Sequence, residues 1–181
     1  KSILFAFYQL TRLPLPCVIF EEKSCGRSTA FFPAVGLLLG LILAALAWAA
    51  QWCFPEQVRA ALLVTGLIVL TGGIHLDGFM DTADAVLSWR PLEDRLRILK
   101  DPHAGSFSVI CVCLLILFQF AAMHSAIERA FDARSLICVP VLTRAAASFA
   151  VTRLRPLGHS QYAHADAAPW FVAAAFAAAG L

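Results

Sequence analysis

The sequence predicts an all-α integral membrane protein, a helical bundle that crosses the bilayer several times. Of its 181 residues, 60% are hydrophobic and only 14% are charged, whereas about 25% of the residues of a typical soluble domain are charged. The apolar residues gather in runs long enough to cross a hydrocarbon core of about 30 Å. The net charge of +2 is too small to indicate a nucleic-acid partner. The expected partner is therefore the lipid bilayer.

We expect four full spans and a truncated fifth in a single membrane-embedded domain, residues 1–181. The apolar run that begins near residue 167 is interpreted as the fifth span cut short, with the C-terminal spans missing. In the second span, the Gly72-Gly73 pair predicts a kink, or a place where another backbone or a ligand comes close. Beyond it the helix is expected to run on toward Trp89. The four full spans are residues 31–54, 58–74, 106–123 and 135–152.

Two polar segments flank these spans. Residues 1–13 are mildly amphipathic, and we expect them either to lie at the membrane interface or to help line the site. Prolines at 14 and 16 should end any helix there. The connector at residues 90–105 is basic; its first part, 91–99, has apolar residues at helical spacing, and the rest must be irregular around Pro102 and Gly105.

The basic residues predict the orientation. Ten of the fourteen Lys and Arg residues fall in segments that four spans would place on one side, three fall on the other, and Arg144 lies inside a span. The positive-inside rule puts the side with ten in the cytoplasm. We therefore expect a multi-pass protein of the bacterial inner membrane, with the Asp-rich helix and the active site at the cytoplasmic face.

The stretch from Gly72 to Ala85 carries the expected chemistry. Successive helical residues turn by about 100°, so Asp77, Asp81 and Asp84 share one narrow face. Carboxylates at such short separations repel one another unless a cation lies among them. Mg²⁺, which prefers oxygen ligands, is the expected ion. The alternative is a solvated cap that favours the helix dipole. Acids beside a membrane span are more often functional, which favours the metal site.

Basic side chains on the same side would bind a phosphorylated substrate. Lys100, with Arg27 or Arg144, is expected to grip phosphate oxygens, and Asp101 to add a metal ligand or orient Lys100. His103 is a candidate base or phosphate donor. Each has a plainer alternative: Lys100 could snorkel at the inner leaflet, Arg144 could pair with a structural carboxylate, and His103 could be an ordinary loop histidine.

The other histidines and the cysteines suggest no further site. His75 points to another face than the acids and is expected to cap or pack. His124, His159 and His164 show no ligand spacing and are interpreted as surface residues. The six cysteines form no CxxC pair and are interpreted as reduced packing residues.

Four segments, in order, resemble the cobalamin synthase family of adenosylcobinamide-GDP ribazoletransferases. The stretch GGIHLDGFMDTAD at residues 72–84 is similar to the family's GGxHLDGxxDTxD motif and is the most specific match. Residues 11–16, TRLPLP, resemble its N-terminal TRLP segment, which includes Arg12. Residues 32–40 resemble the start of its first span, and residues 99–105 its (K/R)DSRxG loop.

This resemblance implies a membrane enzyme that joins adenosylcobinamide-GDP to α-ribazole, or its 5′-phosphate, with release of GMP and a requirement for Mg²⁺. From the residue types together with this resemblance, we expect catalytic roles for Asp77, Asp81, Lys100 and His103. We expect substrate contacts from Arg12, Arg27, Lys100, Asp101 and Arg144. An assembly with further copies of the chain, or with other cobalamin-assembly enzymes, is left open.

The chain departs from the family pattern at two places. Pro102 and His103 stand where the family's loop usually has Ser and Arg. Residues 155–158, RPLG, lack the Glu-Gly of a later family segment. The alternative functions are another membrane transferase of diphosphate-activated alcohols, of the CDP-alcohol phosphotransferase or prenyltransferase type, and a cation-coupled transporter. The transporter predicts acids near mid-bilayer, whereas these acids follow the end of a span.

Overall fold

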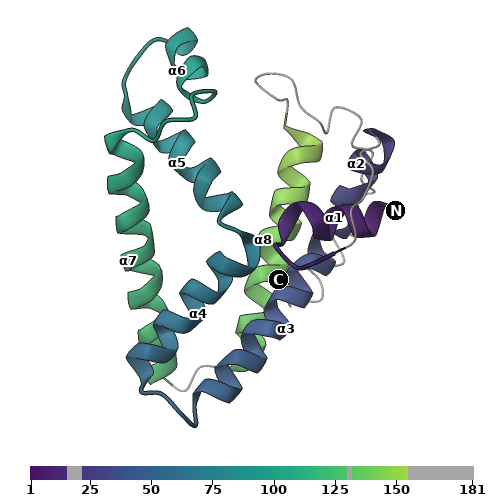
Figure 1. Ribbon diagram of the computed structural model, residues 1–181, viewed down its shortest axis with the longest axis vertical. Coiled ribbons are helices and arrows are strands. Elements are labelled where there is room, and N and C mark those ends of the chain that lie inside the picture. Colours follow the sequence, from purple (N-terminus) through teal and green to yellow (C-terminus); the bar gives the residue numbers. More distant parts are fainter. Residues whose placement is uncertain (16–21, 130–131, 155–181) are drawn as a thin grey trace. The chain divides into compact units, whose positions relative to one another are not determined.

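The computed structural model describes residues 1–15, 22–129 and 132–154, and in these the regular structure is entirely helical (Figure 1). The expected fifth span and the 155–158 segment, with His159 and His164, lie outside the described residues. The helices pack as two units, each described here by itself. The first unit comprises the described residues of Lys1–Cys53 and Phe131–Leu181, and the second those of Phe54–Ala130.

The first unit is built on two long helices, α3 (Phe32–Ala50) and α8 (Ala133–Arg153). The short helices α1 (Ser2–Leu10), α2 (Glu22–Ser28) and η1 (Thr29–Phe31) precede α3. Helix α1 ends at Leu10, and the next residue, Thr11, is extended, in agreement with the break expected from the prolines that follow. The hydroxyl of Ser148 donates to the carbonyl of Thr29 at 2.8 Å, which ties α8 to η1.

Helices α3 and α8 approach closely because two glycines on α3 present no side chain. A Cβ added at Gly40 would lie 2.6 Å from the Cα of Ile137, and one added at Gly36 would collide with the backbone of Pro140. Small residues four apart let two membrane helices bring their backbones together, with packing as the driving force. Gly36 and Gly40 thus set the α3–α8 contact.

The second unit contains α4 (Glu56–Thr71), α5 (Ile74–Leu87), α6 (Leu92–Ile98) and α7 (Ser106–Glu128). Helices α4 and α5 both pack against α7, and the axes of α4 and α5 differ by 90°. The break falls at Gly72 (φ 65°) and Gly73 (φ 71°). These are left-handed values that glycine adopts without steric cost, so the kink expected at this pair is confirmed.

The helix beyond the kink is shorter than the sequence indicated. It ends at Leu87 and does not reach Trp89, whose φ of 53° is left-handed and incompatible with a continuing right-handed helix. Helix α6 follows with Pro91 at its N-cap. The helical spacing of residues 91–99 is therefore confirmed, with Pro91 just before the first turn.

Three segments are long and apolar enough to cross a membrane, namely Cys25–Ala50, Ser106–Glu128 and Ala133–Arg153, and the bent pair of α4 and α5 could count as a fourth. The expected spans at 31–54, 106–123 and 135–152 fall on these helices. Alone, α4 has 16 residues and is about 24 Å long, which is short for a crossing. The second expected span therefore corresponds to a bent pair of helices, α4 and α5, and not to one straight helix.

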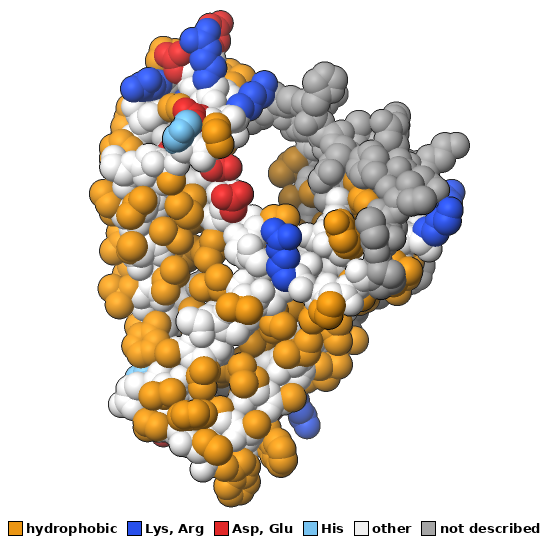
Figure 2. Space-filling model, viewed as in Figure 1, with side chains coloured by type: hydrophobic (Ala, Val, Ile, Leu, Met, Phe, Trp, Pro, Cys, Tyr) orange, Lys and Arg blue, Asp and Glu red, His pale blue; other side chains and the backbone are white. Residues whose placement is uncertain are grey.

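Helix α7 carries apolar residues all round, as a lipid-facing helix does. Many of its large side chains are exposed, among them Val109, Ile110, Leu114, Leu117 and Phe118. Figure 2 shows a group of Lys, Arg, Asp and Glu side chains of the second unit at the end formed by α6 and the connector, beside a largely hydrophobic surface. This distribution suits a protein embedded in a membrane.

Candidate functional site

The three aspartates of the Asp-rich stretch all lie on α5, but their surroundings differ. Asp77 is exposed, Asp81 is half-buried and Asp84 is only 9% exposed. Asp77 lies in the first turn of α5, and no side chain hydrogen-bonds to that helix end. An exposed carboxylate in this position also fits the alternative of a solvated acid that favours the helix dipole. Within residues 25–129, the carboxylates of Asp77 and Asp81 form no hydrogen bond or ion pair with the protein. Two carboxylates one turn apart are thus left without a cation.

Asp84 holds the start of the next long helix. Its Oδ2 accepts the backbone N–H of Gly105 at 2.7 Å, and its Oδ1 accepts that of Ser108 at 2.9 Å. Gly105 is the N-cap residue of α7 and has no side chain with which to cap it. Asp84 therefore satisfies two of the free amides at this helix end, as a capping side chain normally would, but from another helix.

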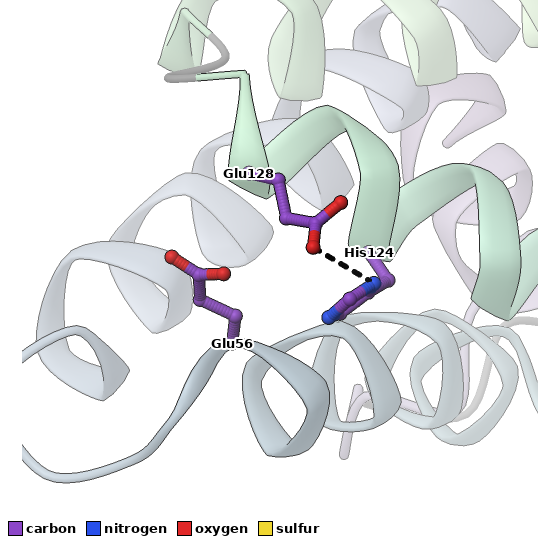
Figure 3. A group of neighbouring side chains, drawn as sticks. All are labelled: Glu56, His124 and Glu128. Carbon is purple, nitrogen blue, oxygen red and sulfur yellow. Dashed lines mark ion pairs between the residues drawn. The ribbon is translucent and has the colours of Figure 1, made fainter.

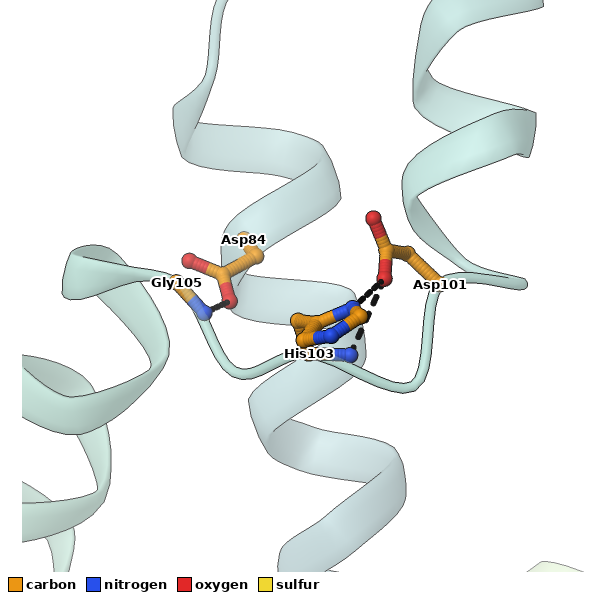
Figure 4. Close-up of polar contacts among 4 residues, drawn as sticks. All are labelled: Asp84, Asp101, His103 and Gly105. Carbon is orange, nitrogen blue, oxygen red and sulfur yellow. Dashed lines mark hydrogen bonds and ion pairs between the residues drawn. The ribbon is translucent and has the colours of Figure 1, made fainter.

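The connector contains a second polar contact, shown in Figure 4 beside the first. The Oδ1 of Asp101 lies 2.6 Å from Nδ1 of His103 and also accepts the backbone N–H of His103 at 3.0 Å. The side-chain hydrogen bond from His103, followed by the backbone one, lowers the pKa of Asp101 below its ordinary value. Because an ionised carboxylate only accepts hydrogen bonds, Nδ1 of His103 carries the proton.

That arrangement determines what the His103 ring can do. With the proton on Nδ1, a neutral ring exposes a lone pair on Nε2, the form required of a general base. The side chain of His103 is 88% exposed, so Nε2 is open to a substrate. His103, one of the two residues that depart from the family's loop pattern, is thus oriented by the carboxylate of Asp101.

The basic residues expected at the site fall in both units. Lys100 follows α6 and is exposed, and within residues 25–129 it forms no ion pair. Arg12 and Arg27 are exposed in the first unit. Arg144, on α8, is 8% exposed, and its Nε has no hydrogen-bond partner among the described residues. The structural carboxylate considered as its partner is not found there.

The second unit therefore brings together the α5 aspartates and the far end of the connector, through Asp84, and it pairs Asp101 with His103. Sequence reasoning did not single out Gly105 or Ser108, which receive Asp84. The long apolar run after Gly105 indicated that a helix starts there. No local pattern indicated that Asp84, on another helix, accepts the free amides at that start.

Comparison with known proteins gives consistent matches. A sequence model of the cobalamin-5-phosphate synthase family matches residues 2–181. The adenosylcobinamide-GDP ribazoletransferase of Clostridium perfringens (strain ATCC 13124) is 36% identical over 169 residues, 90% of this chain and 65% of the relative. That of Roseiflexus sp. is 36% identical over 148 residues, 81% of this chain and 54% of the relative.

A relative from Shewanella denitrificans with the same name is 41% identical over 111 residues, 61% of this chain and 42% of its own length. The matched part of the chain thus spans at most 65% of these three relatives. No solved structure matches the chain.

Proposed function

Because the chain belongs to the cobalamin-5-phosphate synthase family, we propose that it acts as an adenosylcobinamide-GDP ribazoletransferase. The reaction joins adenosylcobinamide-GDP to α-ribazole, or to its 5′-phosphate, and releases GMP, which completes the assembly of cobalamin. Relatives bearing this enzyme name match 90% of the chain. The single domain, the inner-membrane location and a site open to the cytoplasm belong to the same proposal, supported by the apolar helices and the Lys/Arg distribution.

One observation carries the proposal. Asp77 and Asp81 lie one turn apart on α5 and have no protein partner within residues 25–129. Asp84, on the same helix, accepts two backbone amides at the start of α7. The C-terminal end of the connector, which carries Lys100 and His103, is thereby attached to α5. Acids and bases anchored together suit the handling of a diphosphate.

The donor set fits Mg²⁺. Asp77 and Asp81 offer ionised oxygens, which this hard cation prefers. Both oxygens of Asp84 already accept one backbone N–H each; each retains a lone pair, so Asp84 would contribute as a third ligand while holding α7. When bound, the ion would neutralise charge on the diphosphate and polarise the reacting phosphoryl group.

The chain's own residues supply the rest. The ammonium of Lys100 would bind phosphate oxygens of the substrate, with Arg12, Arg27 and Arg144 as further substrate contacts. His103, oriented by Asp101, would accept the proton of the ribazole 5′-hydroxyl through Nε2. The hydroxyl oxygen then forms a bond to the phosphorus attached to cobinamide, the bond from that phosphorus to GMP breaks, and GMP leaves.

The test is a direct assay. The protein in lipid nanodiscs would be given adenosylcobinamide-GDP, α-ribazole and Mg²⁺, and GMP and the joined corrinoid would be followed by chromatography. We expect both products in equal amounts. Asp77→Ala should abolish turnover and leave the helical circular dichroism intact. GMP without joined corrinoid would indicate hydrolysis and contradict the transfer, and full activity of Asp77→Ala would remove the Asp-rich stretch from the mechanism.

A further inference from the structure

A second group of metal-ligating side chains lies in the second unit, at the end of α7 away from Asp84. Glu56 begins α4, and His124 and Glu128 lie one turn apart near the end of α7. One ligand atom from each of the three falls within 4.8 Å of the others. In Figure 3 the side chains of Glu56, His124 and Glu128 point toward a common space, and a dashed line joins Glu128 to the His124 ring.

The imidazole of His124 lacks a good hydrogen bond at either nitrogen. Its Nδ1 is 3.9 Å from Oε1 of Glu128, beyond the range of a hydrogen bond. Its Nε2 is buried and has no partner among the described residues. The ring stacks on Phe120, with the centroids 6.2 Å apart. His124 is therefore packed against Phe120 and is not the surface residue that the sequence predicted. A buried polar atom without a partner destabilises a fold, so a ligand on Nε2 would be stabilising.

The charges around His124 are only partly balanced. Glu56 has one basic neighbour, Arg59, whose NH2 is 3.6 Å from its Oε1. Glu128 lies 3.9 Å from His124. In the described part of the chain, no Lys or Arg lies within ion-pair distance of Glu128. Two carboxylates with one arginine leave a net negative charge beside an unsatisfied imidazole. A cation with an affinity for nitrogen as well as oxygen would satisfy all three groups.

We propose that Glu56, His124 and Glu128 bind a divalent metal ion of the Zn²⁺ type. One imidazole nitrogen and two carboxylate oxygens, with a fourth position left for water, form a donor set that Zn²⁺ accepts. In a tetrahedral site the ligand atoms lie about 3.3 Å apart, so small side-chain rotations from the present 4.8 Å limit would close it. The exposed side of Glu128 leaves a path for entry.

This site is distinct from the proposed Mg²⁺ site. His124 lies about 24 Å along α7 from Ser108, where Asp84 binds. The donor sets also differ, since the aspartates offer only oxygen and this cluster includes nitrogen. The expected role is structural: the ion would join the start of α4 to the end of α7, so that the bent α4–α5 pair is fixed to α7 at both ends.

The experiment is equilibrium dialysis of Zn²⁺ against the protein in nanodiscs, with excess Mg²⁺ present. An Asp77→Asn/Asp81→Asn background removes the oxygen-only site. We expect that background to bind one equivalent of Zn²⁺ and its melting temperature to rise with Zn²⁺. Adding His124→Gln should weaken binding by about 100-fold or more. No bound Zn²⁺ in the background, or an unchanged affinity with His124→Gln, would overturn the proposal.

Two further variants protect the conclusion. Glu128→Gln changes an exposed side chain and should fold normally, so it should lower Zn²⁺ affinity by about tenfold or more even where His124→Gln fails to fold. Glu93→Gln, an exposed acid on α6, is the matched control and should leave Zn²⁺ binding unchanged. Equal effects of Glu128→Gln and Glu93→Gln would contradict the assignment. Zn²⁺ binding and GMP release are measured separately, so a negative result in one experiment contradicts only the proposal that it tests.

Discussion

The carboxylate of Asp84 on α5 lies against Gly105, the N-cap residue of α7, and accepts its backbone N–H at 2.7 Å. This contact joins residues on either side of the polar connector. The connector carries Lys100, Asp101 and His103, and its exit is therefore fixed relative to the aspartates of α5. Glycine is required at the contact because there is no room for a side chain.

The first prediction concerns that lack of room. A Cβ at position 105 would lie 2.6 Å from Oδ1 of Asp84, and Asp84 cannot turn away without losing its bonds to α7. Gly105→Ala should therefore lower the free energy of unfolding by about 1–3 kcal/mol. Thermal unfolding in nanodiscs would measure it.

Gly78→Ala is the matched control for that substitution. Gly78 lies inside α5, and a Cβ there would meet nothing within 4 Å. Since alanine stabilises a helix interior relative to glycine by about 0.5–1 kcal/mol, this variant should melt at the same or a higher temperature. If both variants lost stability equally, the steric argument for Gly105 would be wrong.

The second prediction separates the roles of two aspartates. Asp84→Asn replaces one accepting oxygen with an NH₂ group that faces a backbone N–H, so it should destabilise the protein by about 1–3 kcal/mol. Asp81→Asn removes a carboxylate that has no partner in the described part of the chain. It should leave stability nearly unchanged and lower kcat/KM by about 100-fold or more. The reverse pattern, a stable Asp84→Asn and an unstable Asp81→Asn, would contradict these roles.

Much of this fold could be predicted from the sequence, because long apolar runs have few alternatives to helices in a membrane. The Gly72-Gly73 break was also visible, since paired glycines often mark a bend. The exact end of α5 at Leu87 was not, because the left-handed conformation of Trp89 has no local sequence signal.

The site was predicted less completely than the fold. Helical spacing places Asp77, Asp81 and Asp84 on one face and treats them alike, but the connector folds back and makes Asp84 a cap for α7. The approach of Glu56 to His124 likewise depends on how α4 packs on α7, and no spacing rule joins residues so far apart in the chain. Contacts of this kind follow from tertiary packing alone.

The third prediction is a pH effect at Asp101. Since hydrogen bonds from His103 lower the pKa of Asp101 in the folded protein, the ionised carboxylate stabilises the loop at pH values above the ordinary Asp pKa of about 3.9. That stabilisation should be lost as the pH falls through the lowered folded value. The protection of the His103 backbone amide against hydrogen exchange, relative to an unstructured peptide at the same pH, should fall over the same acidic range.

His103→Ala tests the cause of this shift. Without the ring, Asp101 should titrate closer to its ordinary pKa, so the loop should loosen at a higher pH than in the unmodified protein. Asp101→Asn should lower kcat, because the amide NH₂ group of asparagine can donate to Nδ1 and would then favour the tautomer with its proton on Nε2. An unchanged exchange profile in His103→Ala would show that the contact does not hold the loop.

The last prediction concerns Arg144, a buried cation whose Nε lacks a partner among the described residues. Burial of an unpaired charge is unfavourable, so Arg144→Met should raise the free energy of unfolding by about 1 kcal/mol or more. If Arg144 binds a substrate phosphate, the same variant should raise KM by about tenfold or more. Arg153→Met is the control: Arg153 is exposed on the same helix, with its guanidinium 6.0 Å from the Phe149 ring, so stability should change by no more than about 0.5 kcal/mol. A less stable Arg144→Met with unchanged KM would instead indicate a structural partner, and Arg144 would leave the substrate site.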